Sequence, residues 1–343
     1  MTAPAATRAP NGATDAASAS PITMAQALNR VLAEALASDP KVVLVGEDIG
    51  HAGGVFRVTD GLLARFGAAR VLDTPLAESA IIGAAFGMAL TGLRPIAEIQ
   101  FMGFLYKAIG QLAAQAAQVR ARTWGQVNAP LVVRCPYGGG VRTPEHHADS
   151  LEVLLAHSPG LKVVCPSTPA DAAGLLRSAI NDPDPVVVME PIRLYRAGRE
   201  LVADDAPPVP IGSARVRRTG SDVTVIAWGA MVPVALAGAE TAAAMGIDAE
   251  VIDLRTLAPL DAETTGASLE KTGRLVVVHE APLTGGLGGD VVADLVERCF
   301  WALRAPPRRV TGCDVVYPPQ LLEDIYLPDA PRVAQAIRAV MED

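Results

Sequence analysis

Two of the five histidines in this chain, His146 and His147, stand side by side in the stretch PEHHADS, between Glu145 and Asp149. Such a pair could bind a metal, pack in a core or take part in catalysis. A metal site would need a third ligand nearby, and neither HxxxH nor HxH spacing is present. Adjacent side chains also point in different directions in regular structure. The pattern therefore favours one positioned acid–base histidine beside a structural neighbour.

A second candidate is Glu78, in the stretch DTPLAES. Thr74 is expected to cap a helix whose first turn begins at Pro75, which puts Glu78 at about the fourth helical position. The sequence after Glu78 carries no charge until Arg94. A carboxyl group buried there could exchange protons near neutral pH. The alternative is an acid that only pairs with the helix dipole.

Two glycine-rich stretches mark further loops. Three glycines at 138–140 follow an expected strand and precede the histidines, and they would allow a close backbone approach to a ligand. The stretch HEAPLTGGLGGD matches neither the P-loop nor the G-x-G-x-x-G pattern. It is either a loop at a partner surface or cofactor mouth, or a place of tight packing between a helix and a strand.

The chain also lacks the GDG…N pattern with which thiamine enzymes hold magnesium and diphosphate. If this chain takes part in thiamine chemistry, another chain must hold the phosphates of the cofactor.

The elements that must position these residues alternate between helix and strand. Uniformly apolar strands indicate parallel sheets covered on both faces, whose ligands bind beyond the carboxyl ends of the strands. The aperiodic, proline-containing segment 196–212 indicates a boundary between two α/β domains. The predicted helices are 22–39, 74–92, 101–123, 169–182, 231–245, 261–271, 288–303 and 331–342, and the predicted strands are 41–48, 131–136, 161–166, 185–191, 223–229, 249–255, 274–280 and 308–314.

Length and composition narrow the function classes. The chain has 343 residues, half of them apolar, which is enough for two domains with their own cores. A net charge of −8 and the lack of a basic cluster argue against nucleic acid as a partner. No apolar run is long enough to span a membrane, and the four cysteines lack CxxC spacing, as expected of a cytoplasmic protein. Residues 1–21 are expected to form a disordered tail, without the apolar segment of a signal peptide.

Motifs along the chain resemble one known family. The stretches VGEDIGHAGGVFRVTDGL, DTPLAES, RPIAEIQF, PYGGGVRTPEHHADS, GLKVVCPSTPADA and HEAPLTGGLGG occur in this order, within a match that runs from 22 to 341. They are similar to the beta subunit of the thiamine-diphosphate-dependent 2-oxoacid dehydrogenase (decarboxylating) component. GGVFR, AEIQF and EPIRLYR look most like the branched-chain type, with the bacterial pyruvate type close behind and the acetoin type as a further alternative.

The resemblance implies two doubly wound α/β domains, a pyrimidine-binding domain at 22–200 and a transketolase C-terminal-type domain at 201–343. It implies oxidative decarboxylation of a branched-chain 2-oxoacid, with acyl transfer to lipoamide. Thiamine diphosphate would be shared with an alpha subunit that holds the magnesium, in an α2β2 heterotetramer docked on a lipoyl-bearing dihydrolipoyl acyltransferase core. An inactive paralogue that keeps the fold as a scaffold is the alternative.

The resemblance also assigns roles to single residues. Glu78 matches the glutamate that hydrogen-bonds the aminopyrimidine ring nitrogen, and His147 matches the histidine thought to assist acyl transfer. The positions that line the cofactor pocket are Leu76, Gln100 and Phe104. A structural potassium site, built largely from carbonyl oxygens, would lie at Leu131, Ala179, Asp182 and Asp184.

The chain departs from the family pattern in the stretch FMGFLYKAIGQL. Met102, Lys107 and Gly110 stand where similar chains often have Asp, Pro and Asp. These positions are expected beside the cofactor pocket and the subunit interface, so they bear on the substrate range and on the fit of the alpha subunit.

Overall fold

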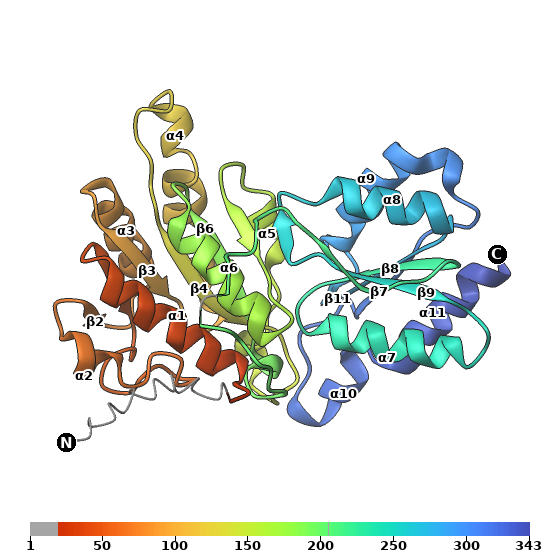
Figure 1. The fold of residues 1–343 in the computed structure, drawn as a ribbon, viewed down its shortest axis with the longest axis horizontal. Coiled ribbons are helices and arrows are strands. Elements are labelled where there is room, and N and C mark those ends of the chain that lie inside the picture. The colour runs from red at the N-terminus through yellow and green to blue at the C-terminus, as the bar shows by residue number, and fades with distance from the viewer. Residues whose placement is uncertain (1–19, 205) are drawn as a thin grey trace, which may run out of the picture.

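Two sheets, each covered by helices on both faces, organise the chain in the computed structural model, which describes residues 20–204 and 206–343 (Figure 1). The two α/β domains lie side by side, and the C-terminus lies on the second (Figure 1). This architecture confirms the prediction of two doubly wound domains. Residues 1–19 of the predicted tail lie outside the described residues.

The first sheet has seven strands in the order β10-β5-β6-β4-β3-β1-β2. Neighbouring strands pair in parallel, except β10, which runs antiparallel to β5. The parallel strands therefore end at one edge of the sheet, where ligands are expected. The strands are β1 (Val42–Gly46), β2 (Val71–Asp73), β3 (Arg94–Glu98), β4 (Val132–Tyr137), β5 (Lys162–Val164), β6 (Val186–Pro191) and β10 (Thr256–Ala258).

Helices cover this sheet on both faces. Side chains alternate along each strand, so Leu44 packs with α1 and α6 on one face, while Val45 packs with α3 on the other. The first helix begins at Met24, two residues after the predicted start, because Thr23 and Gln26 form a capping box there. The helices of this domain are α1 (Met24–Ser38), α2 (Leu62–Phe66), α3 (Glu78–Leu90), α4 (Val119–Arg122), α5 (Glu152–Ala156) and α6 (Pro169–Asn181).

The second sheet has five strands in the order β12-β11-β8-β9-β7, with β7 antiparallel to β9. Helices α7 and α11 cover one face, and α8 and α9 cover the other (Figure 1). The strands are β7 (Arg215–Arg218), β8 (Val223–Ala227), β9 (Ala249–Asp253), β11 (Leu275–Pro282) and β12 (Arg308–Gly312), and the helices are α7 (Met231–Ala243), α8 (Ala262–Thr272), α9 (Gly288–Cys299), α10 (Glu323–Tyr326) and α11 (Ala330–Glu342).

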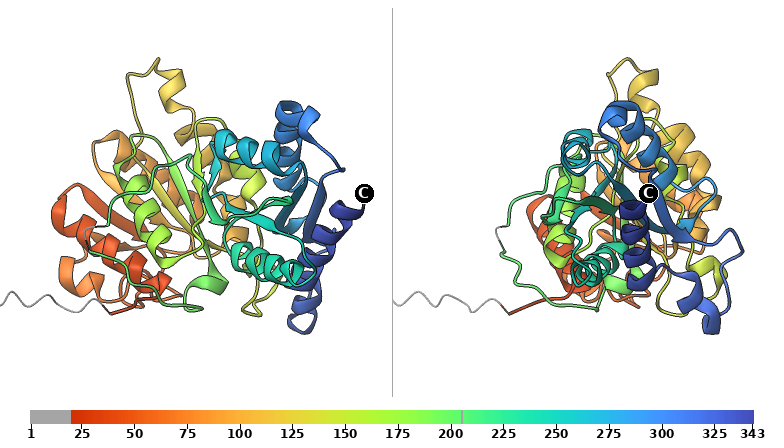
Figure 2. Two further views of the ribbon diagram at one scale, coloured as in Figure 1. Left: turned by 45° about the vertical axis from the view of Figure 1, so that its right-hand side comes forward. Right: turned by 90° about the vertical axis from the view of Figure 1, so that its right-hand side faces the viewer.

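The two domains share a continuous core. Buried side chains run from α3 and β1 through Trp228 at the end of β8 to α8 and α9. Strand β10 comes from the second half of the sequence but pairs with β5 in the first sheet. In the left view of Figure 2 the second domain lies directly against the first. The second domain is therefore packed firmly against the first.

The prediction of one regular helix at 101–123 is wrong. The segment forms a 3₁₀ turn at Met102–Lys107, a π-helical turn at Gly110–Ala116 and then the short helix α4. Gly103 packs so closely on the His146 carbonyl that a Cβ atom there would clash. Single π-helical turns are uncommon and often lie at functional sites. This irregular backbone brings two side chains of the 3₁₀ turn to the edge of the sheet.

No helix within residues 20–204 and 206–343 is long and apolar enough to cross a membrane. The four cysteines are free thiols. Three of them are buried and one, Cys313, is exposed.

Candidate functional site

Glu78 is the first residue of α3 and is only 4% exposed. The chain before it passes the end of β1, where the Thr74 amide donates to the Gly46 carbonyl at 2.9 Å. The prediction that Thr74 caps this helix is wrong, because Ala77 precedes α3 and makes no side-chain cap. The buried Thr74 Oγ1 has no hydrogen-bond partner within the described residues. Glu78 thus lies at the carboxyl edge of the sheet and not one turn inside a helix.

Lys107 of the 3₁₀ turn lies close to Glu78, and Phe104 of the same turn lies close to Lys107. Lys107 Nζ is 3.9 Å from Glu78 Oε2, and the same ammonium is 5.8 Å from the centre of the Phe104 ring. The Glu78 side chain is 5% exposed, whereas the Lys107 side chain is 63% exposed. A buried carboxylate therefore lies beneath a solvent-facing cation, and that cation also approaches an aromatic ring.

Acidic groups accumulate at this edge. Gln100 Nε2 donates to Asp48 Oδ2 at 3.2 Å and approaches the Glu47 carbonyl at 3.5 Å. Burial raises the pKa of Glu47, repulsion from Asp48 and Glu78 raises it further, and Lys107 lowers it. The edge thus carries three carboxyl groups, of which Glu47 gives up its proton less readily than an ordinary glutamate.

His147 lies in an aromatic cluster. The 3₁₀ turn Glu145–His147 places its ring 4.5 Å from Phe101 and 5.2 Å from Phe104, both edge to face. Its Nδ1 atom is buried and has no hydrogen-bond partner in the part of the chain that the structure describes. A ligand or another chain is left to supply one. His146 instead lines a separate cavity. Among the described residues, no group of three or more His, Cys, Asp or Glu side chains could hold a metal ion.

A buried ion network supports the edge from within the sheet. Arg134 on β4 donates to Glu98 on β3 at 2.5 Å and to both carboxylate oxygens of Glu190 on β6 at 2.7 and 2.8 Å. The Tyr195 hydroxyl donates to Glu190 at 2.6 Å. Burial raises the pKa of Glu98, although Arg134 opposes the rise. Sequence reasoning missed this network, and its signal was a charge within each of the apolar stretches RPIAEIQF, LVVRCP and PVVVMEP.

The three glycines at 138–140 approach the second domain closely. The Gly139 amide donates to Glu280 and the Gly140 amide donates to Glu323, each at 2.9 Å. A Cβ atom at Gly139 would overlap the Tyr317 hydroxyl. Within the described residues, this close backbone approach is to the second domain.

The second glycine-rich stretch also packs tightly. Gly286 and Gly288 lie against the His279 ring, which stacks on Trp228 with 5.3 Å between ring centres. Burial lowers the pKa of His279 to about 4, so this histidine stays neutral in the folded chain. Of the two alternatives for this stretch, the structure favours packing between strand and helix.

Leu76, predicted in the cofactor pocket, is 65% exposed and lies two residues before Glu78. Its exposed side chain is therefore available to a ligand or to another chain. Its role remains a prediction.

The predicted potassium positions lie in a basic environment. Lys162 Nζ donates to both carboxylate oxygens of Asp182 at 2.7 Å, and Arg120 donates to Asp184 at 2.6 Å. The Leu131 and Ala179 carbonyls already accept backbone amides. The potassium site stays a prediction, and two basic side chains already neutralise its carboxylates.

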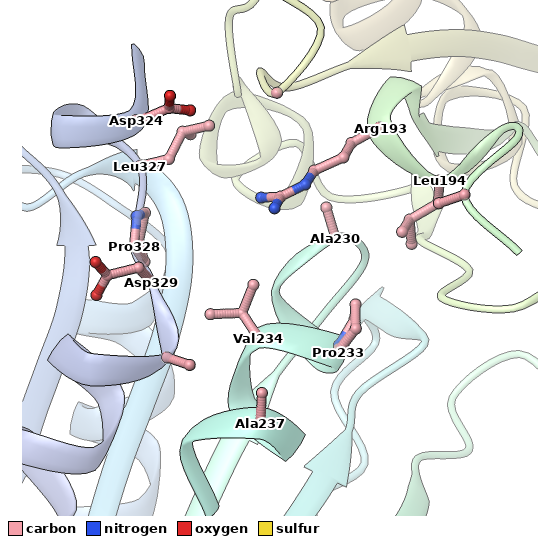
Figure 3. A pocket seen from close by; sticks show the side chains of 13 residues that line it. Arg193, Leu194, Ala230, Pro233, Val234, Ala237, Asp324, Leu327, Pro328 and Asp329 are labelled. Atoms are coloured by element: carbon pink, nitrogen blue, oxygen red, sulfur yellow. The ribbon is translucent and has the colours of Figure 1, made fainter. Parts of the chain in front are cut away.

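Two cavities open where the domains meet. In the larger, of about 620 Å³, Arg193 points inward from the first domain toward Val234 and Asp324 of the second (Figure 3). The smaller, of about 450 Å³, is lined by His146 and Glu280 among others. Neither is lined by the side chains gathered around Glu78.

Known families cover most of the described chain. Residues 20–198 match the family described as Transketolase, pyrimidine binding domain, and residues 212–333 match Transketolase, C-terminal domain. The "Pyruvate dehydrogenase E1 component subunit beta" of Staphylococcus epidermidis is 50% identical over 321 residues, which cover 94% of this chain and 99% of that protein. The protein of the same name from Acholeplasma laidlawii is 48% identical over 317 residues, covering 92% and 97%. The chain belongs to the family of 2-oxoacid dehydrogenase E1 beta subunits.

This E1 beta subunit also resembles a solved structure, described as "Split gene transketolase, inactive beta4 tetramer". The TM-score is 0.76 at 26% identity, and the match covers 94% of this chain and 99% of that one. The comparisons confirm the family resemblance and the fold. The relatives are pyruvate enzymes by name, so the pyruvate alternative fits better than the branched-chain expectation.

Proposed function

We propose that this E1 beta subunit binds the aminopyrimidine end of thiamine diphosphate in a component that decarboxylates pyruvate. The supporting observation is the buried Glu78 carboxylate at the carboxyl edge of the pyrimidine-binding domain. Lys107 lies between this carboxylate and the Phe104 ring, and Gln100 bonds Asp48 at the same edge. The 50% identity to a pyruvate dehydrogenase beta subunit supports pyruvate as the substrate.

The donor set fits the pyrimidine ring but not the diphosphate. A ring with basic nitrogens and an amino group needs a carboxylate, an amide and an apolar ring face, which Glu78, Gln100 and Phe104 offer. A diphosphate needs cations or free backbone amides. This edge carries three acidic side chains, Glu47, Asp48 and Glu78, and one basic side chain, Lys107. The excess of negative charge would repel a diphosphate. The proposal therefore gives the diphosphate and the magnesium to an alpha subunit, in an α2β2 heterotetramer.

The chain's own residues would act on protons and on water. When bound, thiamine diphosphate supplies the electron sink for decarboxylation of a 2-oxoacid. The Glu78 carboxylate accepts a hydrogen bond from the protonated ring nitrogen and keeps that proton in place. Phe101 and Phe104 shield the His147 ring from water. His147 then exchanges a proton where the acyl group leaves for the lipoamide of a dihydrolipoyl acyltransferase core.

The test is turnover by the complex of this chain with its copurifying alpha subunit. Reduction of an artificial electron acceptor is followed with pyruvate, 2-oxobutyrate or the branched-chain 2-oxoacids, with and without thiamine diphosphate and magnesium. We expect cofactor-dependent turnover that is fastest with pyruvate. Fastest turnover with a branched-chain acid would contradict the substrate assignment. No turnover from an assembled, cofactor-loaded complex would contradict the enzymatic role and support a scaffold.

A further inference from the structure

Lys107 is a departure from the family pattern that the proposed function does not use. It ends the 3₁₀ turn at Met102–Lys107, and its ammonium lies 3.9 Å from Glu78 Oε2 and 5.8 Å from the Phe104 ring centre. It therefore covers, from the solvent side, the two residues to which the pyrimidine ring is assigned. A cation at this place bears directly on how the ring reaches its carboxylate.

The surroundings of Lys107 hold its side chain by charge and its backbone by a hydrogen bond. Glu78 is its ion-pair partner, and Glu47 and Asp48 belong to the same acidic cluster. The side chain is 63% exposed, so burial contributes little to its position. The Ser79 hydroxyl on α3 donates to the Lys107 carbonyl. The side chain can thus leave Glu78 while the 3₁₀ turn stays in place.

We propose that Lys107 is a positioning residue that competes with the aminopyrimidine ring for the Glu78 carboxylate. This inference rests on the proposed function. In the cofactor-free subunit the ammonium neutralises Glu78, and ring binding takes over the carboxylate and releases the ammonium to solvent. A long, half-exposed ion pair opposes binding only modestly. Its removal should tighten thiamine diphosphate binding roughly two- to fivefold.

The Lys107 ammonium should also oppose protonation of the bound pyrimidine ring. A pyrimidine nitrogen that takes up a proton becomes positively charged. The Lys107 ammonium, which stays tethered at this edge after it leaves Glu78, disfavours that form. Removal of the ammonium should therefore raise the pH at which the bound ring loses its proton. This readout concerns the charge state of the bound ring and not the rate of turnover.

The test uses the complex of this chain with its alpha subunit. Calorimetry at saturating magnesium gives the dissociation constant of thiamine diphosphate for the wild type, Lys107→Met, Lys107→Arg, Glu78→Gln and the double variant. Near-ultraviolet circular dichroism across pH follows protonation of the bound ring. Lys107→Met should bind roughly two- to fivefold tighter and move the midpoint to higher pH, and Lys107→Arg should stay near the wild type. In the Glu78→Gln background, Lys107→Met should no longer tighten binding, because no carboxylate is left for the ammonium to compete for.

The outcomes separate this inference from the proposed function. Unchanged affinity in Lys107→Met overturns the inference, as does an equal change in affinity with and without the Glu78 carboxylate. Both results leave the proposed function intact if the wild-type complex binds the cofactor. A wild-type complex that binds no thiamine diphosphate overturns both. Lys107→Gln replaces Lys107→Met if size-exclusion chromatography shows that the methionine disturbs assembly.

Discussion

Replacement of one buried acid should change the stability of this protein in a strongly pH-dependent way. Glu152, the first residue of α5, is 1% exposed, and neither carboxylate oxygen has a hydrogen-bond partner within the described residues. Burial raises its pKa to about 7, although the Trp228 indole and the backbone amide of Glu152 act against the rise without reaching hydrogen-bond geometry. We expect Glu152→Gln to stabilise the protein at alkaline pH and to leave it nearly unchanged at acidic pH.

The magnitude follows from the two pKa values of Glu152. The side chain titrates near 4.5 when unfolded and near 7 when folded. The difference, at about 1.36 kcal/mol per pH unit, gives roughly 3 kcal/mol. Because the folded-state pKa is raised, the stabilisation by the bound proton is fully present below pH 4.5 and is lost as the pH rises through 7. The neutral amide of Glu152→Gln avoids that loss.

Thermal unfolding of the assembled complex at about pH 5 and pH 8.5 tests this reasoning. A gain of roughly 3 kcal/mol corresponds to an increase of about 5–10 °C in Tm for a domain of this size. We expect that increase for Glu152→Gln at pH 8.5 and little change at pH 5. Glu240→Gln, on the exposed surface of α7, is the matched control and should change neither value. The same Tm shift at both pH values would refute the role of ionisation, and no shift at pH 8.5 would refute the raised pKa.

Three further substitutions have defined outcomes. Glu78→Gln should lower cofactor-dependent turnover about 10²- to 10⁴-fold, with α2β2 assembly unchanged by size-exclusion chromatography; wild-type turnover would remove Glu78 from the site. His147→Asn should slow acyl transfer to lipoamide more than reduction of an artificial acceptor, and equal losses in the two assays would argue against a role in transfer. Arg134→Met should destabilise the fold by about 3–5 kcal/mol, because it leaves Glu98 and Glu190 buried without their cation. Denaturant unfolding measures this loss of stability, and a smaller loss would argue against a stabilising network.

Periodicity predicted the helices and strands best where local sequence and packing agree. Helix α1 has a capping box at Thr23, and the strands at 132–137 and 186–191 are continuous apolar runs between two layers of helices. The segment 101–123 has the same helical spacing of apolar residues, but it breaks into 3₁₀ and π-helical turns. The cause is a contact from a distant part of the chain: Gly103 packs on the His146 carbonyl. A local pattern cannot report such a contact.

Resemblance to family motifs indicates the site residues better than the periodicity and charge pattern of the sequence do. Glu78 was expected in the fourth helical position but begins the helix, because the chain crosses the end of β1 before α3 starts. The stretch around Arg134 predicts an apolar strand, although Arg134 holds two buried glutamates. Its partners lie on neighbouring strands that are far apart in sequence, so only the sheet order β6-β4-β3 brings the three charges together.

The second domain fixes the loop that carries His147, although its described residues add no side chain to the cluster around Glu78. Glu280 and Glu323, both from the second domain, accept hydrogen bonds from backbone amides of the glycine loop that precedes the histidine. Such bonds are strongest when the acceptor is ionised. Burial and nearby carboxylates raise the pKa of Glu280 to about 7, and the Gly139 amide opposes the rise. The glycine loop therefore helps to ionise the carboxylate that holds it, and the position of His147 depends on the contact between domains and not on the stretch PEHHADS alone.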